Sequence, residues 1–166
     1  MSSRALERFE ETLSSLPVTS TRTTADEFGS TIDDVVGAPA VGVEPPFEGA
    51  TLAGTDVTLD PTPAELREAR TGVTAAGPAI AEYGSVVIQS GPEGVSLYPG
   101  RHVAVVAASD VVGTMADAIP LLGTSIRDGT TSAVVATGPS ATADMGELVL
   151  GAHGPRDVHV VVLEGE

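Results

Sequence analysis

Two long apolar runs constrain the fold of this chain more than any other feature. HVAVVAA covers residues 102–108, and VHVVVLE covers residues 158–164. A strand with one face in water alternates apolar and polar residues, whereas an uninterrupted apolar run suits a strand covered on both faces. Such strands are typical of a mostly parallel sheet with helices on both faces. The two runs therefore predict a three-layer α/β fold.

Shorter runs extend the predicted sheet. SAVVAT (132–137) predicts a third strand of the buried type, and SVVIQ (85–89) predicts a strand between two glycine-containing turns. AVGV (40–43) and DVTLD (56–60) are further strand candidates.

Helix signals lie between these runs. Apolar residues recur at helical spacing over residues 3–15, before Pro17. Capping-box patterns at 24–27 and 62–65 predict helices over 28–36 and 63–71.

The remaining helix signals lie in the second half of the chain. GPAIAE (77–82) predicts a short helix after GVTAA (72–76). Thr114 starts a helix that runs to about residue 126, and Pro120 is expected to bend or split it. Helices alternating with strands predict one domain over residues 1–166, with a variable helical part at 1–60 and a motif-bearing core at 61–166.

Composition excludes several functional classes. The chain has 166 residues and no cysteine, so it holds no disulfide, thiolate zinc site or iron–sulfur cluster on cysteines of its own. All eight basic residues are arginine, which excludes a phosphate-loop lysine and a Schiff-base lysine. No cofactor or metal motif is identifiable.

The charge of the chain bears on its partners. The net charge of −15 disfavours nucleic-acid binding and is typical of halophilic proteins. No signal peptide or membrane-spanning run is visible, so we expect a cytoplasmic protein without membrane contact.

A stretch rich in glycine and small polar residues, GPSATADMGELVLGAHGP, covers 138–155. Its first half follows the SAVVAT run, so we expect it at the carboxyl end of a strand, where open α/β sheets bind ligands. Gly138 suits a positive φ, and Ser140 and Thr142 offer hydroxyls. Asp144 offers a carboxylate that accepts from a hydroxyl, orients a histidine or holds a cation.

The second half of the stretch adds an imidazole to a tight turn. His153 and Gly154 precede Arg156, a cation suited to neutralising an anionic ligand. The alternative is that both halves are ordinary turns, since glycine and proline mark turns in general. His102 and His159 lie in the apolar runs and are expected to be hydrogen-bonded scaffold residues.

GVTAAGPAIAEYGSVVI (72–88), followed by the glycine-rich stretch and VHVVVLE, resembles the lactate-utilisation protein C family, which carries the LUD domain. The resemblance covers roughly residues 65–165. It implies the fold of sugar-phosphate isomerases and CoA-transferases. It also implies an accessory role in oxidising L-lactate to pyruvate beside iron–sulfur partner proteins, with a small anionic ligand.

Two positions depart from the family pattern. Tyr83 stands where the family usually has threonine, and Ala141 stands where it usually has a base. Arg101 or Arg156 would then have to supply the charge for an anion.

Glu82 is the candidate catalytic carboxylate, because CoA-transferases of this fold use a glutamate in a Glu-x-Gly turn as their nucleophile. With Asp144 and His153 it would form an enzyme site for acyl, CoA or sugar-phosphate chemistry, with Gly84 in the ligand-binding turn. A third hypothesis is a ligand sensor or assembly module. We expect Glu82, Ser140, Asp144 and His153 to meet in one pocket.

Overall fold

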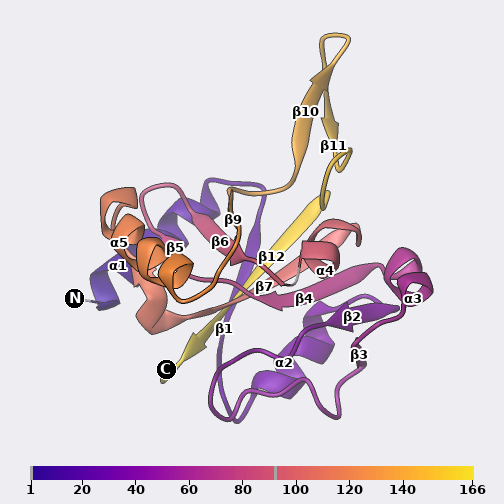
Figure 1. The fold of residues 1–166 in the computed structure, drawn as a ribbon, viewed down its shortest axis with the longest axis horizontal. Helices are drawn as coiled ribbons and strands as arrows, with labels where there is room; N and C mark the ends of the chain where they lie inside the picture. Colours follow the sequence, from indigo (N-terminus) through magenta and orange to yellow (C-terminus); the bar gives the residue numbers. More distant parts are fainter. Residues whose placement is uncertain (1, 92) are drawn as a thin grey trace.

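The computed structural model describes residues 2–91 and 93–166. These residues form a six-stranded sheet, a smaller four-stranded sheet and a two-stranded hairpin (Figure 1). Helices lie on the outer faces of the two larger sheets. The expected α/β class, with a parallel central sheet between helices, is therefore confirmed.

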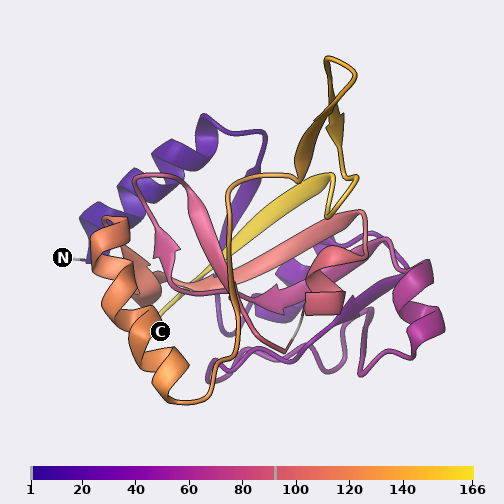
Figure 2. The ribbon, with the colours of Figure 1, turned by 45° about the horizontal axis from the view of Figure 1, so that its top comes forward.

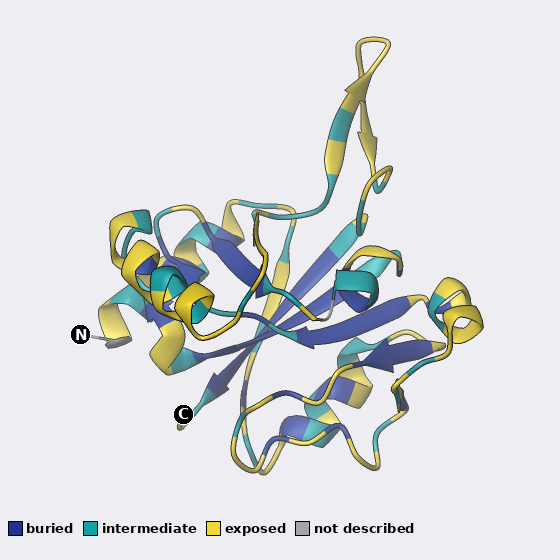
Figure 3. Ribbon diagram, viewed as in Figure 1, coloured by how far each residue is buried: buried dark blue, intermediate teal, exposed yellow. Residues whose placement is uncertain are grey.

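The six-stranded sheet is parallel at every pairing between described residues. Its spatial order is β1 (Thr19–Thr24), β12 (Asp157–Glu164), β7 (Arg101–Ala107), β4 (Thr71–Ala75), β2 (Ala40–Gly42) and β3 (Val57–Leu59). The two longest apolar runs, β7 and β12, lie side by side in the interior of the sheet and are buried along nearly their whole length (Figure 3). The prediction for these two strands is confirmed.

Each face of the large sheet packs against apolar side chains of a helix. On one face, Phe28 and Ile32 of α2 (Phe28–Val35) contact a cluster that includes Val103 and Val161. On the other face, Phe9 and neighbouring side chains of α1 (Ser2–Ser14) pack against alternate residues of β7 and β12 and against the smaller sheet. Alternation along a strand thus sends neighbouring residues into two separate clusters.

The smaller sheet has the order β8 (Val111–Val112), β5 (Ala79–Ile80), β6 (Ser85–Gln89) and β9 (Ala133–Ala136). A one-turn helix, η1 (Ala108–Asp110), leads from β7 into β8. Helix α5 (Met115–Arg127) covers the outer face, where Ala118 packs against Ile80 and Val87 (Figure 2). The smaller sheet is thus a layer between the large sheet and α5.

Capping boxes open two of the helices. Thr62 and Glu65 cap α3 (Pro63–Glu68) reciprocally, as the sequence pattern predicted. Thr114 and Asp117 do the same for α5. The short helix α4 (Glu93–Leu97) lies between β6 and β7.

The helix expected over 77–82 is wrong, because this segment contains strand β5. Pro78 has no N–H to donate, and the Gly77 and Ala81 amides bond to the carbonyls of Val87 and Val112 at 2.8 and 2.9 Å. A six-residue helix gains little by itself, so pairing with two neighbouring strands prevails.

The buried character expected for residues 132–137 is also wrong. Strand β9 lies at the edge of the smaller sheet and runs antiparallel to β6, and Val134 and Val135 are 44% and 42% exposed. An apolar run alone does not show whether a second layer covers it.

Two local helix expectations also differ from the structure, one at the start of α2 and one within α5. Helix α2 starts with Glu27 at its N-cap and no side-chain cap, while Thr24 belongs to β1. Pro120 does not split α5, which continues to Arg127. Pro120 and Ala116 are both exposed, so the hydrogen bond that proline removes lies away from the core.

A strand of the large sheet and a hairpin are among the elements that sequence reasoning did not predict. Strand β1, TSTRTT, has no apolar pattern, yet it pairs with β12 over its whole length. Strands β10 (Ala141–Asp144) and β11 (Glu147–Leu150) form a hairpin that projects from the body of the molecule (Figures 1 and 2).

Candidate functional site

The glycine-rich stretch closes a cavity of about 210 Å³, here called the His153 cavity. Its walls come from the large sheet, the smaller sheet, α1 and α4, and from the turns at 137–140 and 153–155. The polar side chains in the lining are Ser96, His102, Thr137, Ser140 and His153.

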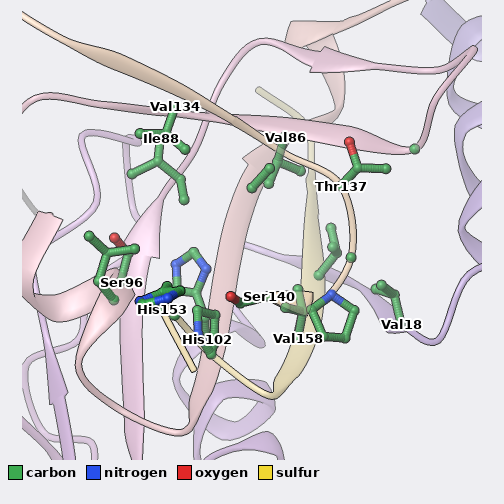
Figure 4. A pocket seen from close by; sticks show the side chains of 18 of the residues that line it. Val18, Val86, Ile88, Ser96, His102, Val134, Thr137, Ser140, His153 and Val158 are labelled. Atoms are coloured by element: carbon green, nitrogen blue, oxygen red, sulfur yellow. The ribbon is translucent and has the colours of Figure 1, made fainter. Parts of the chain in front are cut away.

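The polar and apolar groups of the His153 cavity are separated. Ser140, His102 and His153 lie together at one end, opposite the valines and isoleucine of the smaller sheet (Figure 4). A cavity with an apolar wall and a few convergent polar groups is the usual form of a small-molecule site.

The sequence analysis predicts that the glycine-rich stretch 138–155 lies at the carboxyl ends of the parallel strands. For the six-stranded sheet this prediction is wrong. The stretch does follow the end of β9, but β9 belongs to the smaller sheet. In the large sheet, the cavity is lined by His102, near the amino end of β7, and by Val158 and Val160, in the first half of β12.

Two glycines of the lining allow the turns to meet. Gly84 has φ +67, and a Cβ there would stand 2.9 Å from Cδ1 of Leu16. A Cβ on Gly154 would stand 3.0 Å from the Cβ of Ser140. The amide of Ser140 donates to the Pro155 carbonyl at 2.8 Å, which fixes the two halves of the stretch against each other.

His102 is a neutral group at the base of this cavity. It is 2% exposed, and its Nε2 is 2.8 Å from the Thr74 hydroxyl. Burial lowers the pKa of His102 to about 4, because the imidazolium would lose its hydration there. At neutral pH the ring therefore offers hydrogen bonds without positive charge.

His159 and Arg101 lie on the face of the large sheet opposite the His153 cavity, because they alternate along their strands with the lining residues His102 and Val158. His159 bonds the hydroxyls of Thr19 and Thr21 at 2.6 and 3.1 Å, so its expected scaffold role is confirmed. Burial, with a smaller contribution from the Arg101 charge, lowers the pKa of His159. Arg101 pairs with Asp157 and lies outside the His153 cavity lining, so it is already neutralised by a carboxylate.

Glu82 lies outside the lining of the His153 cavity, although Gly84 of the same turn belongs to it. Its carboxylate accepts the amide of Met115 at 2.8 Å, at the first turn of α5. A carboxylate in this position satisfies an unpaired helix amide and complements the helix dipole.

Three other predicted residues also lie outside this lining. Thr142 and Asp144 belong to β10, where Asp144 is exposed beside the hairpin turn. Arg156 follows the lining residue Pro155, and its Nε would be 3.7 Å from a Cβ on Gly100. The structure thus brings together Gly84, Gly138, Ser140, His153 and Gly154, and leaves Glu82, Thr142, Asp144 and Arg156 outside.

A second, larger cavity of about 710 Å³ lies at the carboxyl edge of the large sheet and is here called the Asp110 cavity. Sequence reasoning did not single out its polar residues, among them Asp110, Glu44 and Gln89. The available signal was positional, because Asp110 follows the apolar run of β7. Partial desolvation raises the pKa of Asp110.

Two kinds of feature are absent from the described part of the chain. No helix there is long and apolar enough to cross a bilayer. No three His, Asp or Glu side chains of residues 2–91 and 93–166 gather closely enough to hold a metal ion.

Comparison with known proteins agrees with this architecture. Residues 53–163 match the LUD domain family. A Lactate utilization protein C from Deinococcus radiodurans is 31% identical over 173 aligned residues, which cover 95% of this chain and 79% of that protein. One from Bacillus licheniformis is 36% identical over 104 residues, 58% of this chain and 43% of the relative.

A solved structure supports the fold. The crystal structure of a DUF162 family protein from Deinococcus radiodurans superposes with a TM-score of 0.75 at 24% identity, over 98% of both chains. Together, the match over most of the core and the 31% identity over nearly the whole sequence show that this chain belongs to the LUD-domain proteins of the lactate utilization protein C family.

Proposed function

We propose that this chain acts in lactate utilisation as an accessory component beside iron–sulfur proteins, and that its His153 cavity binds a small carboxylate. The kinship with Lactate utilization protein C over 95% of the chain carries the proposal. A protein without cysteine fits a component that depends on partners for iron–sulfur chemistry.

The dimensions of the His153 cavity support a short carboxylic acid as the ligand. Its volume of about 210 Å³ lies below the range of drug-sized pockets and suits a molecule of a few carbons. A short 2-hydroxy or 2-oxo acid has a methyl group for the apolar wall and a polar head for Ser140 and His153. The Ser140 hydroxyl and a ring N–H of His153 can donate hydrogen bonds to the carboxylate.

Gene deletion and complementation test the role in the cell. We expect the deletion strain to lose growth on L-lactate and to keep growth on glucose. The wild-type gene should restore lactate growth, and the double variant Ser140→Ala/His153→Ala should not. Thr142→Ala, a hydroxyl in the same stretch but outside the cavity lining, is the matched control and should restore growth.

Two further measurements separate the parts of this proposal. Titrating the purified protein with L-lactate and pyruvate should shift the amide resonances of Ser140 and Gly154 in the wild type only. Tagged protein from lactate-grown cells should co-purify with proteins that show iron–sulfur absorbance. Unchanged lactate growth after deletion would refute the role, and resonances that do not move would refute the ligand.

Acyl transfer at Glu82 stays a hypothesis without structural support, because its carboxylate is bonded to Met115. Incubation with acyl-CoA compounds, followed by mass spectrometry of the peptide that contains Glu82, is its direct test. If the protein binds a carboxylate but neither converts it nor co-purifies with partner proteins, the sensor hypothesis is favoured instead.

A further inference from the structure

The Asp110 cavity lies where three parallel strands of the large sheet end. Strand β2 ends at Gly42, β4 at Ala75 and β7 at Ala107. Among the residues that follow them, 43, 44, 46, 47, 76–78 and Asp110 contribute to its lining. Each strand thus delivers a loop to the same cavity.

The connections of the sheet diverge at this point. Strands β2 and β4 are neighbours. The strand after β2 is β3, on one side, whereas the chain passes from β4 through β5, β6 and α4 and returns to the large sheet as β7, on the other side. Such divergence opens a crevice outside the carboxyl ends of the two strands. Open α/β sheets bind their ligands in this kind of crevice, at the point where the strand order reverses.

The smaller sheet separates this cavity from the His153 cavity. Val86 and Ile88 line the His153 cavity, whereas Val87 and Gln89 line the Asp110 cavity. Alternation along β6 sends these pairs to opposite faces of the sheet. The two cavities are therefore separate sites, and a ligand in one does not block the other.

The walls of the Asp110 cavity are largely apolar. Phe47, Pro78 and Val87 contribute from three different segments, and Leu121 contributes from α5. The volume of about 710 Å³ is within the range of sites for drug-sized molecules. A ligand there can bury a ring or a branched chain.

The charged side chains that line the Asp110 cavity are all acidic. The Asp110 carboxylate forms no hydrogen bond or ion pair with the described residues, and Gly77 leaves room for it, since a Cβ there would stand 3.3 Å from its Oδ2. Glu44 adds a second carboxylate, which accepts the amide of Leu52 at 3.1 and 3.2 Å. None of the lining residues is basic. An anionic ligand would meet repulsion here without compensation.

We propose that the Asp110 cavity is a second ligand site, which binds an organic cation that carries an apolar ring or chain. The apolar walls hold the body of the ligand, and the Asp110 carboxylate accepts hydrogen bonds from its amine or amidine head. A metal ion fits less well, because no three carboxylates or imidazoles of the described residues gather there. The site is independent of the carboxylate site proposed above and goes beyond it.

Benzamidine is the test probe, because it joins a flat apolar ring to a cationic head that pairs with a carboxylate through two hydrogen bonds. We expect it to shift the amide resonances of Gly77, Gln89 and Asp110 saturably, with a Kd on the order of 1 mM, as befits a fragment of its size. Benzoate, of the same shape and opposite charge, should leave these resonances in place.

Two variants localise the effect. Asp110→Asn keeps the shape of the side chain and removes its charge, and we expect binding about tenfold weaker, the usual cost of a charged hydrogen bond. Asp34→Asn makes the same change in net charge on the exposed side of α2 and should bind like wild type. Ser125→Trp should fill the cavity from α5 and abolish binding.

Three outcomes would overturn the proposal. Equal shifts with benzoate would show that charge does not select the ligand. Equal affinity in the Asp110→Asn variant would show that this carboxylate does not hold it. Shifts spread over acidic surface residues would show only general attraction to a chain of net charge −15.

Discussion

At the scale of single residues, His102 has two roles, because it is a buried core residue and also lines the candidate site. The ring lies within the core, bonds Thr74 and lines the His153 cavity. Its pKa of about 4 lies below that of an unfolded histidine, near 6.5. The unfolded chain therefore takes up a proton at a pH where the folded chain does not.

This difference predicts how stability depends on pH. The contribution of His102 to the free energy of unfolding is fully present above about pH 6.5. It is lost as the pH drops toward about 4, and the loss is on the order of 3 kcal/mol. Urea denaturation at intervals across this window measures it. His102→Gln, which keeps a hydrogen-bonding group for Thr74, should flatten the dependence.

His159 is present in both the wild type and the His102→Gln variant. The difference in the free energy of unfolding between the two proteins at each pH therefore reports on His102. A constant stability gap between wild type and variant at every pH would contradict the prediction.

The residues of the site were predictable only in part. The turn signals at Gly84, Gly138 and Gly154 led correctly to segments that meet, because glycine and proline report backbone geometry directly. Glu82 and Asp144 are candidates only because carboxylates can act as nucleophiles or ligands, and residue type alone does not say where a side chain points. Asp110 carries no motif and became visible only when the sheet topology was known.

At the scale of elements, the contact of α4 with the large sheet depends on a missing side chain. A Cβ on Gly72 of β4 would stand 1.8 Å from the carbonyl oxygen of Val95 in α4. The obstacle is backbone rather than the end of a flexible side chain. The helix can therefore give way only by moving as a unit.

Gly72→Ala should accordingly destabilise the protein strongly, by about 3 kcal/mol or more, because overpacking against backbone forces the helix off the sheet. Gly29→Ala in α2 is the matched control. Its Cβ would meet only ordinary contact, 3.7 Å from Cγ2 of Thr55, so the helix propensity of alanine should leave stability equal or higher. Thermal unfolding of both variants measures the difference, and a Gly72→Ala protein as stable as wild type would refute the packing.

Elements were predictable where one local signal dominated. The runs of β7 and β12 and the capping boxes of α3 and α5 fix their structures locally. Strands β1 and β5 have no such signal and form because partners in the sheets bond their backbones. Pairing between distant segments is a property of the fold and cannot be deduced from a window of sequence.

At the scale of the whole molecule, the repulsion between acidic side chains opposes folding. With 23 acidic and 8 basic residues, the folded chain holds like charges closer together than the unfolded chain does. The three ion pairs between described residues involve only Arg22 and Arg101, so most carboxylates have no cationic partner there.

Salt should therefore raise stability. Increasing NaCl from about 0.05 M to about 1 M shortens the Debye length from more than 10 Å to roughly 3 Å, and we expect about 1 kcal/mol, or roughly 2–4 °C in Tm. Scanning calorimetry measures the shift. A triple variant, Asp26→Asn/Asp34→Asn/Glu48→Gln, removes three exposed charges and should respond less to salt. Identical salt responses would contradict the electrostatic origin.

The projecting β10–β11 hairpin has a practical consequence. Its tip, at Met145 and Gly146, stands clear of every layer, and Met145 is 98% exposed (Figure 3). Exposed tips tolerate inserted sequence best. An epitope or a fluorescent protein spliced between these two residues would leave both cavities and both chain ends unobstructed. Such an internal handle would allow capture of the protein from living cells without a terminal tag.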